Sequence, residues 1–361
     1  MTATTHPEFN DSTEALDVAK AFADRVHGKT ILVTGVNRNG IGFSTAQAFA
    51  SQSPAHLILA GRTPAKIQES IDALKADYPN VDYRPLILDL SKQKSVRAGA
   101  AEFLSWSDVP TLDILVNSAG VMNIPERTIS EDGIEMHFAT NHIGHFLFTC
   151  LVMPKLIKAA EANPKGATRI VNVSSGSPAV AGMRWSDLNF EKKNKDLPAE
   201  EQPNYEFQGL WGETDAQEKS YLPLEGYNQS KVANVLFGIG ANKRLYEKYG
   251  ILSLGLHPGI IQTELSRVAL PKTLEAIQTM HESGMFSFRS LGAGGATSLV
   301  AALDPKLGLP ETKAGEEKEN RGAYLWDCQI SDRARPGAVS SAEAEKLWAL
   351  SEELVKEKFS W

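Results

Sequence analysis

Short apolar runs alternate with helical patterns along almost the whole chain, and this alternation restricts the fold more than any other feature. The helical stretches repeat apolar residues every three or four positions, as amphipathic helices do. Such alternation predicts a parallel sheet with right-handed crossovers. Because runs this short and apolar are typical of strands buried on both faces, we expect an α/β fold: a doubly wound, single-domain Rossmann sheet of about seven strands with helices on both faces. The expected strands are Thr30–Thr34, His56–Ala60, Asp82–Leu88, Leu112–Asn117, Thr168–Val173, Ile251–His257 and Ala323–Trp326.

The body of the chain is expected to form one domain, because 361 residues fit a large α/β domain with insertions and no internal repeat is visible. A polar leader with one amphipathic helix is expected over residues 1–27, followed by a nucleotide-binding domain over residues 28–361. Residues 184–222 are polar and contain prolines, which predicts a long surface insertion. Residues 305–320 predict a flexible loop, which begins a C-terminal extension over residues 305–361.

Composition and charge narrow the class of protein. The chain is 42% hydrophobic, and its net charge of -7 is a poor match to nucleic acid, which is bound through a positive field. The N-terminal segment lacks an apolar signal core, and no apolar run approaches the roughly 20 residues of a membrane span. We therefore expect a cytoplasmic protein that binds no nucleic acid and has no stable membrane anchor. Cys150 and Cys328 lack metal-binding spacing, so we expect reduced thiols and no metal site.

A glycine-rich turn follows the first expected strand and leads into a helix, in the stretch Thr34–Gly42. Glycines let the backbone turn tightly and approach a pyrophosphate, which then lies at the helix N-terminus. A plain glycine-rich turn is the alternative, but the position between the first strand and the first helix favours a dinucleotide. The candidate cofactor contacts in this turn are Gly35, Asn37, Arg38, Gly40, Ile41 and Gly42.

The residues after the second expected strand favour NADP(H) over NAD(H). An acidic residue usually binds the ribose 2′-hydroxyl of NAD at this point, but here the strand runs into Gly61-Arg62-Thr63. The guanidinium of Arg62 suits a phosphate through its paired donors, and Arg38 could reach the same group. A solvated surface position is the alternative for either arginine. Asp89, after the third strand, could meet the adenine or cap the next helix.

Three side chains predict acid–base chemistry at the carboxyl ends of the strands. Ser175 follows the strand Thr168–Val173, where ligands of doubly wound sheets bind. Tyr227 and Lys231 lie one helical turn apart on one face. The ammonium of Lys231 is expected to favour the phenolate of Tyr227 and lower its pKa from about 10, which suits a proton donor to a carbonyl that receives hydride. Alone, the spacing also fits an exposed helix pair.

Taken in order, the motifs are TGVNRNGIG, GRT, LDL at 88–90, NSAG at 117–120, Asn141 in ATNHIGHF, VNVSS, YNQSK and HPGIIQT at 257–263. With this set the chain resembles the short-chain dehydrogenase/reductase family over roughly residues 28–303. The tail motifs GAYLWDC and AEKLWALSEELV extend the similarity to the retinol-dehydrogenase-like subgroup. Each motif is common, but the ordered set is highly specific.

The resemblance implies a role for each matching residue. Tyr227 is the expected general acid/base, Lys231 lowers its pKa and binds ribose hydroxyls, and Ser175 holds the substrate oxygen. Asn141 is expected to anchor a water of a proton relay. The further cofactor contacts that the motifs imply are Asp89, Leu90, Asn117, Ala119, Gly120, Pro258, Gly259, Ile261 and Thr263.

The chain also departs from the family pattern. The glycine loop has one extra residue between Gly35 and Gly40, which leaves the phosphate contacts of residues 37–39 open. The insertion separates Ser175 from Tyr227 and is expected to reshape the substrate entrance. NSAG replaces the commoner double-asparagine form, and a polar leader replaces the apolar anchor of membrane-bound members.

Residues 264–288 correspond to the segment that covers the substrate in this family. Its apolar residues suit an apolar or aromatic small molecule, with ordinary core packing as an equal alternative. The apolar face of the helix at Tyr227–Tyr249 fits a homodimer contact or burial against the chain's own sheet.

We therefore expect an NADP(H)-dependent oxidoreductase that interconverts a ketone or aldehyde and an alcohol. The alternative is an NADPH-sensing regulatory protein, which would need no proton donor. An epimerase or dehydratase of the longer family branch is disfavoured by the Gly-Ile-Gly ending of the loop and by the single-domain length.

Overall fold

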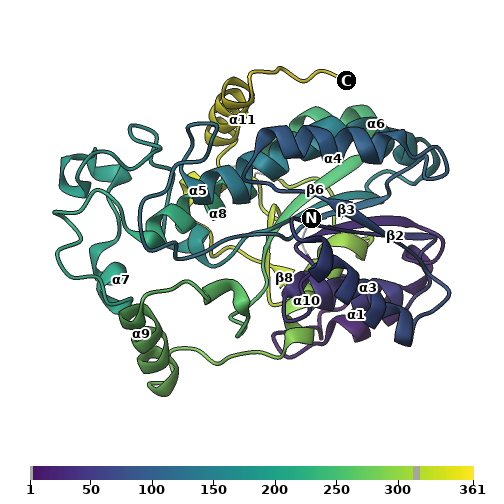
Figure 1. Ribbon diagram of the computed structural model, residues 1–361, viewed down its shortest axis with the longest axis horizontal. Coiled ribbons are helices and arrows are strands. Elements are labelled where there is room, and N and C mark those ends of the chain that lie inside the picture. Colours follow the sequence, from purple (N-terminus) through teal and green to yellow (C-terminus); the bar gives the residue numbers. More distant parts are fainter. Residues whose placement is uncertain (1–2, 312–317) are drawn as a thin grey trace.

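The computed structural model describes residues 3–311 and 318–361, and within them the chain forms one eight-stranded sheet (Figure 1). The strand order is β3-β2-β1-β4-β5-β6-β7-β8, and all neighbouring pairs are parallel except β7 and β8. The order reverses between β1 and β4, which is the switch point where such sheets bind ligands. The strands are β1 (Thr30–Thr34), β2 (His56–Gly61), β3 (Asp82–Ile87), β4 (Ile114–Asn117), β5 (Thr168–Val173), β6 (Ile251–His257), β7 (Tyr324–Trp326) and β8 (Gln329–Ile330).

The Rossmann-type α/β fold expected from the sequence is confirmed, with one addition at the edge of the sheet. The seven expected strands occur, while β8 was not predicted. It pairs antiparallel with β7 through a two-residue turn at Asp327 and Cys328, whose φ angles are 54° and 62°. Positive φ at both central residues is the geometry of tight hairpins. A strand of two residues shows no periodicity, so pattern analysis could not detect it.

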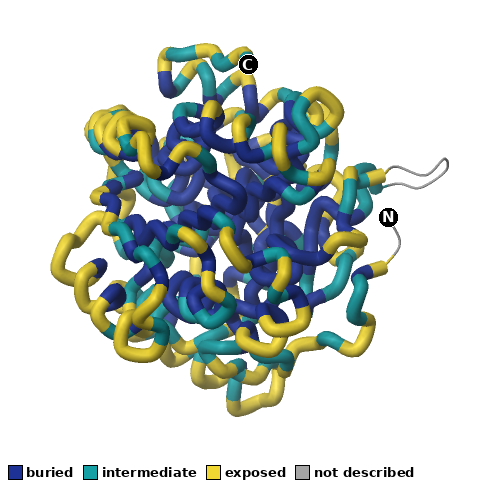
Figure 2. Tube along the Cα trace, turned by 90° about the vertical axis from the view of Figure 1, so that its right-hand side faces the viewer, coloured by how far each residue is buried: buried dark blue, intermediate teal, exposed yellow. Residues whose placement is uncertain are grey.

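Helices cover both faces of the sheet and give two separate cores (Figure 1). One face carries α1 (Ala15–Ala21), α2 (Ile41–Ala50), α3 (Pro64–Asp77) and α10 (Leu291–Leu303). The other face carries α4 (Gln93–Ser105), α6 (Gly144–Ala162), α8 (Pro223–Tyr249) and α11 (Ser341–Val355). The tube view shows the buried residues concentrated in the middle of the molecule and the exposed ones in the outer loops (Figure 2).

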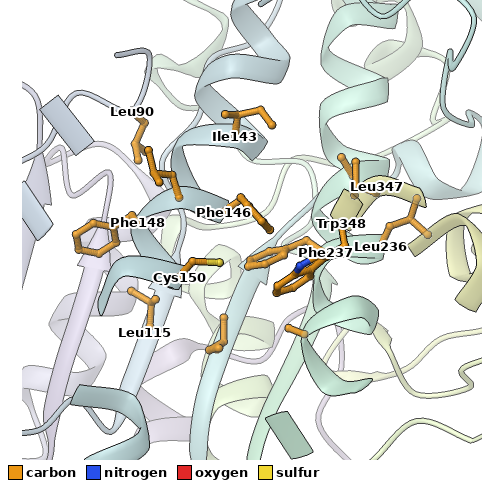
Figure 3. Close-up of a cluster of buried hydrophobic side chains, with 14 of the residues drawn as sticks. Leu90, Leu115, Ile143, Phe146, Phe148, Cys150, Leu236, Phe237, Leu347 and Trp348 are labelled. Carbon is orange, nitrogen blue, oxygen red and sulfur yellow. The ribbon is translucent and has the colours of Figure 1, made fainter. Parts of the chain in front are cut away.

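The C-terminal helix α11 completes the core on the second face (Figure 3). Trp348 of α11 and Phe237 of α8 both pack against Phe146 of α6, with ring centroids 5.1 and 5.6 Å from that of Phe146. Aromatic contacts of this kind add to the free energy gained from burial alone. The helix α11 therefore packs against both α6 and α8 and holds them together.

The N-terminal segment is packed into the first face. Val18 and Ala19 of α1 are fully buried in the core formed by α2 and α10. Before α1, the backbone N–H of Thr5 donates to Asp304 at 2.7 Å, and the hydroxyl of Thr4 donates to Gln329 at 2.6 Å. The expected leader thus contacts residues that are 299 and 325 positions later in the sequence.

The insertion at residues 184–222 contains short helices, of which α7 (Tyr205–Leu210) is the longest. It lies beside α9 (Pro271–Glu282) in the segment 264–288 (Figure 1), and Glu213 pairs with Lys272 of α9 at 2.8 Å. A buried ion pair between Arg184 and Asp187, at 2.6 Å, fixes the start of the insertion. Residues 312–317 of the expected loop 305–320 lie outside the described residues.

One helical segment among the described residues, Met136–Ala162, is by length and composition apolar enough to cross a membrane. It includes α5 (Met136–Phe138) and α6, and 72% of its most apolar window is buried inside the fold. Burial to this extent is typical of a core helix. Cys150 in this segment and Cys328 at the β7–β8 turn are both buried and unpaired.

Candidate active site

The glycine loop between β1 and α2 is shaped by two close backbone contacts. Gly35 has φ 77°, and a Cβ there would lie 2.6 Å from the Cα of Ala119. A Cβ on Gly42 would lie 2.4 Å from the carbonyl oxygen of Gly35. Only glycine fits at either position, because no side chain can enter at such distances. The loop is thereby pressed against the segment that follows β4.

The N-terminus of α2 is open to an anion. Gly40 is the N-cap, no side chain caps the helix, and its first turn carries no acidic residue. Free backbone N–H groups and the helix dipole favour a phosphate at such a position. A cleft of about 250 Å³ lies in front of this turn. Of the residues expected to bind the cofactor, those that line the cleft are Gly35, Asn37, Gly40, Ile41, Gly42, Arg62, Asp89, Leu90, Ala119, Gly120 and Thr263.

Three basic residues line this cleft: Arg62 after β2, Lys66 on α3 and Arg267 after β6. Lys66 pairs with Glu264 at 3.0 Å across the cleft. Arg38 does not share this position, because its guanidinium stacks on the ring of Phe43, 4.6 Å from the centroid, and it is exposed. Of the two arginines expected at the phosphate, the structure therefore brings only Arg62 to the cleft.

Asp89 lines the cleft, but one carboxylate oxygen is already engaged. Oδ1 accepts from the backbone N–H and the hydroxyl of Ser91, at 3.2 and 2.7 Å. Such a contact between an aspartate and a residue two positions later is an Asx turn. The side chain thus holds its own loop and does not cap α4, whose N-cap is Lys92 without a side-chain hydrogen bond. Contact of Asp89 with the adenine stays a prediction.

The NSAG segment is fixed to the sheet on both sides. Asn117 is buried and donates to Asn172 at 3.0 Å, which joins β4 to β5. The hydroxyl of Thr34 accepts from the N–H groups of Ser118 and Ala119 at 3.0 and 2.9 Å, which joins the segment to β1. Asn117 therefore steadies the sheet without lining the described cleft, whereas Ala119 and Gly120 line it.

Tyr227 and Lys231 lie in the first turns of α8, and both are buried. Nζ of Lys231 donates to the carbonyl oxygen of Val173 at 2.9 Å and lies 5.6 Å from the centre of the Tyr227 ring. A Cβ on Gly120, which lines the cleft, would lie 3.5 Å from this Nζ, so Lys231 lies next to the cleft without being one of its lining residues. The i, i+4 spacing read from the sequence thus brings the two side chains together at the carboxyl end of β5.

Burial dominates the protonation of this pair. Burial raises the pKa of Tyr227, and its hydrogen bond with Ser175 opposes this shift. Burial lowers the pKa of Lys231 to about 7. Lys231 was expected to lower the pKa of Tyr227, but the net shift of the tyrosine pKa is upward. The reason is that loss of water penalises both charged forms at once.

Ser175 lies directly after β5 and contacts Tyr227 through the hydrogen bond just described. Its hydroxyl donates to that of Ser177 at 2.7 Å and accepts from the Ser177 N–H at 3.0 Å. Its carbonyl oxygen accepts from the hydroxyl of Tyr324 in β7. The insertion that separates Ser175 from Tyr227 in sequence therefore leaves the two side chains adjacent in space.

Asn141 lies in a π-helical turn, Ala139–Ile143, just before α6. Its side chain accepts from the Val121 N–H at 2.8 Å and donates to the hydroxyl of Ser230 at 2.9 Å, so it ties the segment after NSAG to α8. Its carbonyl oxygen accepts from Nδ1 of His145 at 3.0 Å, and Nε2 of that ring lies 2.9 Å from the hydroxyl of Thr34. Burial lowers the pKa of His145 to about 4, which keeps the ring neutral. Single π turns of this kind often mark functional sites.

The segment after β6 approaches the cleft from the other side. Gly259 has φ 97°, and the side chain of Arg289 occupies the place where its Cβ would point. Ile261 packs on Gly294 of α10 and forms an isolated bridge with Arg289. Thr263 lines the cleft and caps the next turn by accepting from the N–H of Leu265 at 3.2 Å. Pro258, Gly259 and Ile261 lie just before it in the chain and do not line the described cleft.

Several lining residues escaped the sequence analysis. Lys66 lies in the first turn of α3, four positions after Arg62, so its closeness in sequence to a predicted phosphate ligand was a signal. Glu264 and Arg267 had no signal, because only the fold brings the segment after β6 against α3. Within the described ranges no group of three or more His, Cys, Asp or Glu side chains could hold a metal ion.

Comparison with known proteins decides the family. Residues 29–187 match the family model of short chain dehydrogenases. Oxidoreductase fscI of Fusarium equiseti is 38% identical over 251 residues, which cover 70% of this chain and 94% of that protein. The protein is a short-chain dehydrogenase. The resemblance stated from the ordered motifs is thereby confirmed.

Other members of the short-chain dehydrogenase family match over more of the chain. Retinol dehydrogenase 12 of Mus musculus is 32% identical, covering 92% of this chain and 87% of that protein. An uncharacterized protein from Mycobacterium paratuberculosis has a crystal structure that aligns with a TM-score of 0.60 at 25% identity, covering 93% of this chain and 96% of that chain. The chain is thus an oxidoreductase of this family, in its retinol-dehydrogenase-like part.

Proposed function

We propose that this short-chain dehydrogenase is an NADP(H)-dependent enzyme that interconverts a ketone or aldehyde and an alcohol, with Tyr227 as general acid/base. The observation that carries the proposal is the meeting of Tyr227, Ser175 and Lys231 at the carboxyl end of β5, with Lys231 next to Gly120 of the cleft. A purely regulatory sensor would need no such proton donor, and the relatives named above are called oxidoreductases or dehydrogenases.

The cleft residues fit a dinucleotide phosphate. The uncapped N-terminus of α2 would bind the pyrophosphate, and Arg62 with Lys66 and Arg267 would surround a 2′-phosphate. Asp89 and Leu90 would border the adenine, and Lys231 would donate to the nicotinamide ribose. Bound NADPH would supply the hydride for carbonyl reduction. The preference for NADPH rests on the three cations and on the absence of an acid in the stretch Gly61–Thr63.

Tyr227 would donate its phenolic proton to the substrate oxygen, and Ser175 would hold that oxygen in place. A phenol whose pKa is raised by burial stays protonated until hydride arrives, which is the state that reduction requires. Lys231 would stabilise the phenolate that forms. Asn141 would anchor the water through which the phenol is reprotonated.

The substrate class follows from the segment 264–288. Val268, Leu274 and Met285 in this segment are 44%, 47% and 57% exposed, which is unusual for large apolar side chains. An apolar or aromatic carbonyl compound would cover them, in line with the name of retinol dehydrogenase 12. For the cell we propose the cytoplasm, where NADPH favours reduction.

The test is nicotinamide absorbance with purified protein, NADPH or NADH, and a panel of ketones, aldehydes and quinones of rising apolar size. We expect oxidation of NADPH, little or no oxidation of NADH, and the highest kcat/KM for large apolar members. Tight NADPH binding with no turnover on any member would contradict the proposal and favour a sensor. Equal use of both nicotinamides would overturn the cofactor assignment alone.

A further inference from the structure

A cavity of about 610 Å³ lies at the carboxyl ends of β6 and β7. It is lined by His257 and Ile260 from the end of β6, by Trp326 of β7 and by the end of the segment 264–288. Among the described residues, none lines both this cavity and the cofactor cleft. Its volume is in the range of pockets that hold drug-sized compounds, and doubly wound sheets bind their ligands at the carboxyl ends of strands. The cavity is therefore a candidate binding site for a small molecule, distinct from the site of the cofactor.

Two sides of the cavity lie close to groups that the proposed reaction uses. A Cβ on Gly176, the residue after Ser175, would lie 3.3 Å from Cη2 of Trp326. On the other side, Arg289 lines the cavity and occupies the place where the Cβ of Gly259 would point. Gly259 is an expected contact of the nicotinamide. A substrate whose oxygen lies at Ser175 would thus have this cavity beside it.

The charged groups around the cavity are paired or in contact with water. Arg289 pairs with Asp327 at 2.6 Å. Asp11 and Arg333 are exposed, so water weakens the effect of their charges. Burial and the neighbouring Arg289 and Arg333 lower the pKa of His257 to about 3, so this ring is neutral. The cavity therefore suits an uncharged ligand better than an ion.

Apolar side chains line the cavity without being covered by the rest of the fold. Ile260 and Met285 are 38% and 57% exposed, and Phe286 and Phe288 add aromatic surface. Large apolar side chains that are exposed together mark binding sites more often than plain surface. The lining therefore predicts an uncharged ligand with a large apolar body, which agrees with the substrate class proposed above.

The N-terminal segment forms a further wall of the cavity. The residues of this wall are Asp11, Ser12 and Glu14. Oε1 of Glu14 accepts from the hydroxyl of Ser290, the N-cap of α10, at 2.5 Å. Just before the wall, the carbonyl oxygen of Phe9 accepts from Nε2 of Gln329 in β8 at 2.7 Å. The wall is thus held at both ends, although it lies outside the residues that match the family model.

We propose that the N-terminal segment is part of the substrate site: the wall formed by residues 11–14 limits how large an apolar group the substrate can carry. The carbonyl group of the substrate would lie at Ser175, and its apolar body would fill the cavity toward this wall. The inference rests on the proposed function, since it requires a carbonyl compound bound at Ser175. It adds a determinant of specificity in a part of the chain to which the family resemblance assigns no role.

The experiment measures kcat/KM with NADPH for methyl ketones whose alkyl chain grows from ethyl to decyl, in full-length Ser12→Trp, Asp11→Trp and Lys20→Trp proteins. The first two changes place an indole at the wall, whereas Lys20 is exposed on α1 outside the cavity lining. In both wall variants the ratio of kcat/KM for the decyl ketone to that for the ethyl ketone should fall about tenfold or more. The reason is that exclusion of two methylene groups already corresponds to a factor on the order of ten. The ratio should change less than about twofold in Lys20→Trp, and the NADPH Kd should be the same in all three variants.

Met285→Ser tests the cavity from another wall. It should lower the same ratio, and adding it to Ser12→Trp should lower the ratio little further, because an alkyl chain that the indole excludes has no contact with Met285 left to lose. Falls that multiply would place the two residues at separate sites and overturn the inference. An unchanged ratio in both wall variants, with the ketones still reduced, would also overturn it and leave the proposed function standing. If the unmodified protein reduces no ketone at all, the proposed function fails and the inference fails with it.

Discussion

Lys66 on α3 and Glu264 after β6 form an ion pair across the cofactor cleft, with 3.0 Å between Nζ and Oε2. Both side chains are nearly half exposed, so the pair contributes little to stability. Its effect is on the cofactor, because Glu264 competes with a phosphate for the same ammonium. We expect Glu264→Gln to lower the NADPH Kd about two- to fivefold and to leave the NADH Kd unchanged.

Lys66→Met should raise the NADPH Kd by a similar factor, and Lys75→Met, an exposed change later in α3, should have no effect. Fluorescence titration with each nicotinamide provides all of these constants. A weaker NADPH complex in Glu264→Gln would show that the carboxylate orders the cleft rather than competing with the phosphate.

Arg62 is the residue on which the NADPH preference chiefly depends. Arg62→Ala removes charge-assisted hydrogen bonds to a 2′-phosphate, and about 1.5–3 kcal/mol corresponds to a rise in NADPH Kd of roughly 10- to 100-fold. Arg38→Ala is the matched control, because Arg38 stacks on Phe43 and should change the Kd less than about threefold. Equal losses for NADPH and NADH in Arg62→Ala would contradict the assignment.

Tyr227→Phe keeps the buried ring and removes the proton donor. We expect turnover to fall by a factor of about 10²–10⁴ or more, with NADPH Kd near that of the unmodified protein. Tyr221→Phe is a suitable comparison, since Tyr221 donates to the carbonyl oxygen of Ile124 at 2.8 Å and has no place in the proposed reaction. It should lower Tm and retain most activity. Substantial turnover by Tyr227→Phe would remove Tyr227 from the mechanism.

Lys231 predicts how stability depends on pH in the protein without cofactor. Burial lowers its pKa from 10.5 to about 7, so between these values the unfolded chain holds a proton that the folded chain has released. Because stability rises with pH wherever the unfolded state binds more protons, this group makes the free energy of unfolding increase above pH 7. Below pH 7 both states are protonated, so this group adds no slope and the cost of burying its charge is at its full value.

Urea unfolding at intervals from pH 7 to pH 9 measures that slope. Lys231→Met should flatten it, and the variant should gain stability relative to the unmodified protein toward the acidic end. An identical slope in the variant would mean that Lys231 stays charged throughout, and the pKa assigned to it would be wrong.

The N-terminal helix provides a test of whether residues 1–27 belong to the folded unit. Val18 is fully buried and Leu16 is 44% exposed, only two positions apart on α1. Val18→Asp places an unpaired charge in the core and should cost several kcal/mol of unfolding free energy, whereas Leu16→Asp should cost less than about 0.5 kcal/mol. The midpoints of urea unfolding of the two variants measure these two costs. Similar midpoints would indicate that α1 detaches readily.

The sequence predicted the sheet well because its strands are short apolar runs with clear ends. Thr30–Thr34, Thr168–Val173 and Ile251–His257 match the observed strands residue for residue. The placement of Tyr227 beside Lys231 was equally accessible, since it needs only helix geometry. Such features can be predicted because their physical cause lies in residues that are close together in the sequence.

Other features depend on contacts between distant segments, and no local pattern encodes them. Ser12 and Met285 line one cavity from segments far apart in the sequence, and the carbonyl oxygen of Phe9 accepts from Gln329 across 320 positions. The stacking of Arg38 on Phe43 was missed for another reason: charge alone predicted an anion contact, while a nearby aromatic ring offered a competing one.

Thr5 and Asp304, which form two hydrogen bonds, are separated by 299 positions, and Thr4 bonds to Gln329 farther still. During synthesis the N-terminal segment leaves the ribosome first and its partners almost last. A nascent chain that already has β1 to β6 contains α2 but still lacks α10, the other helix on which α1 rests. Docking of α1 is then a late step in folding, and a translation product that stops before Leu291 leaves Val18 and Ala19 without α10 and open to chaperones.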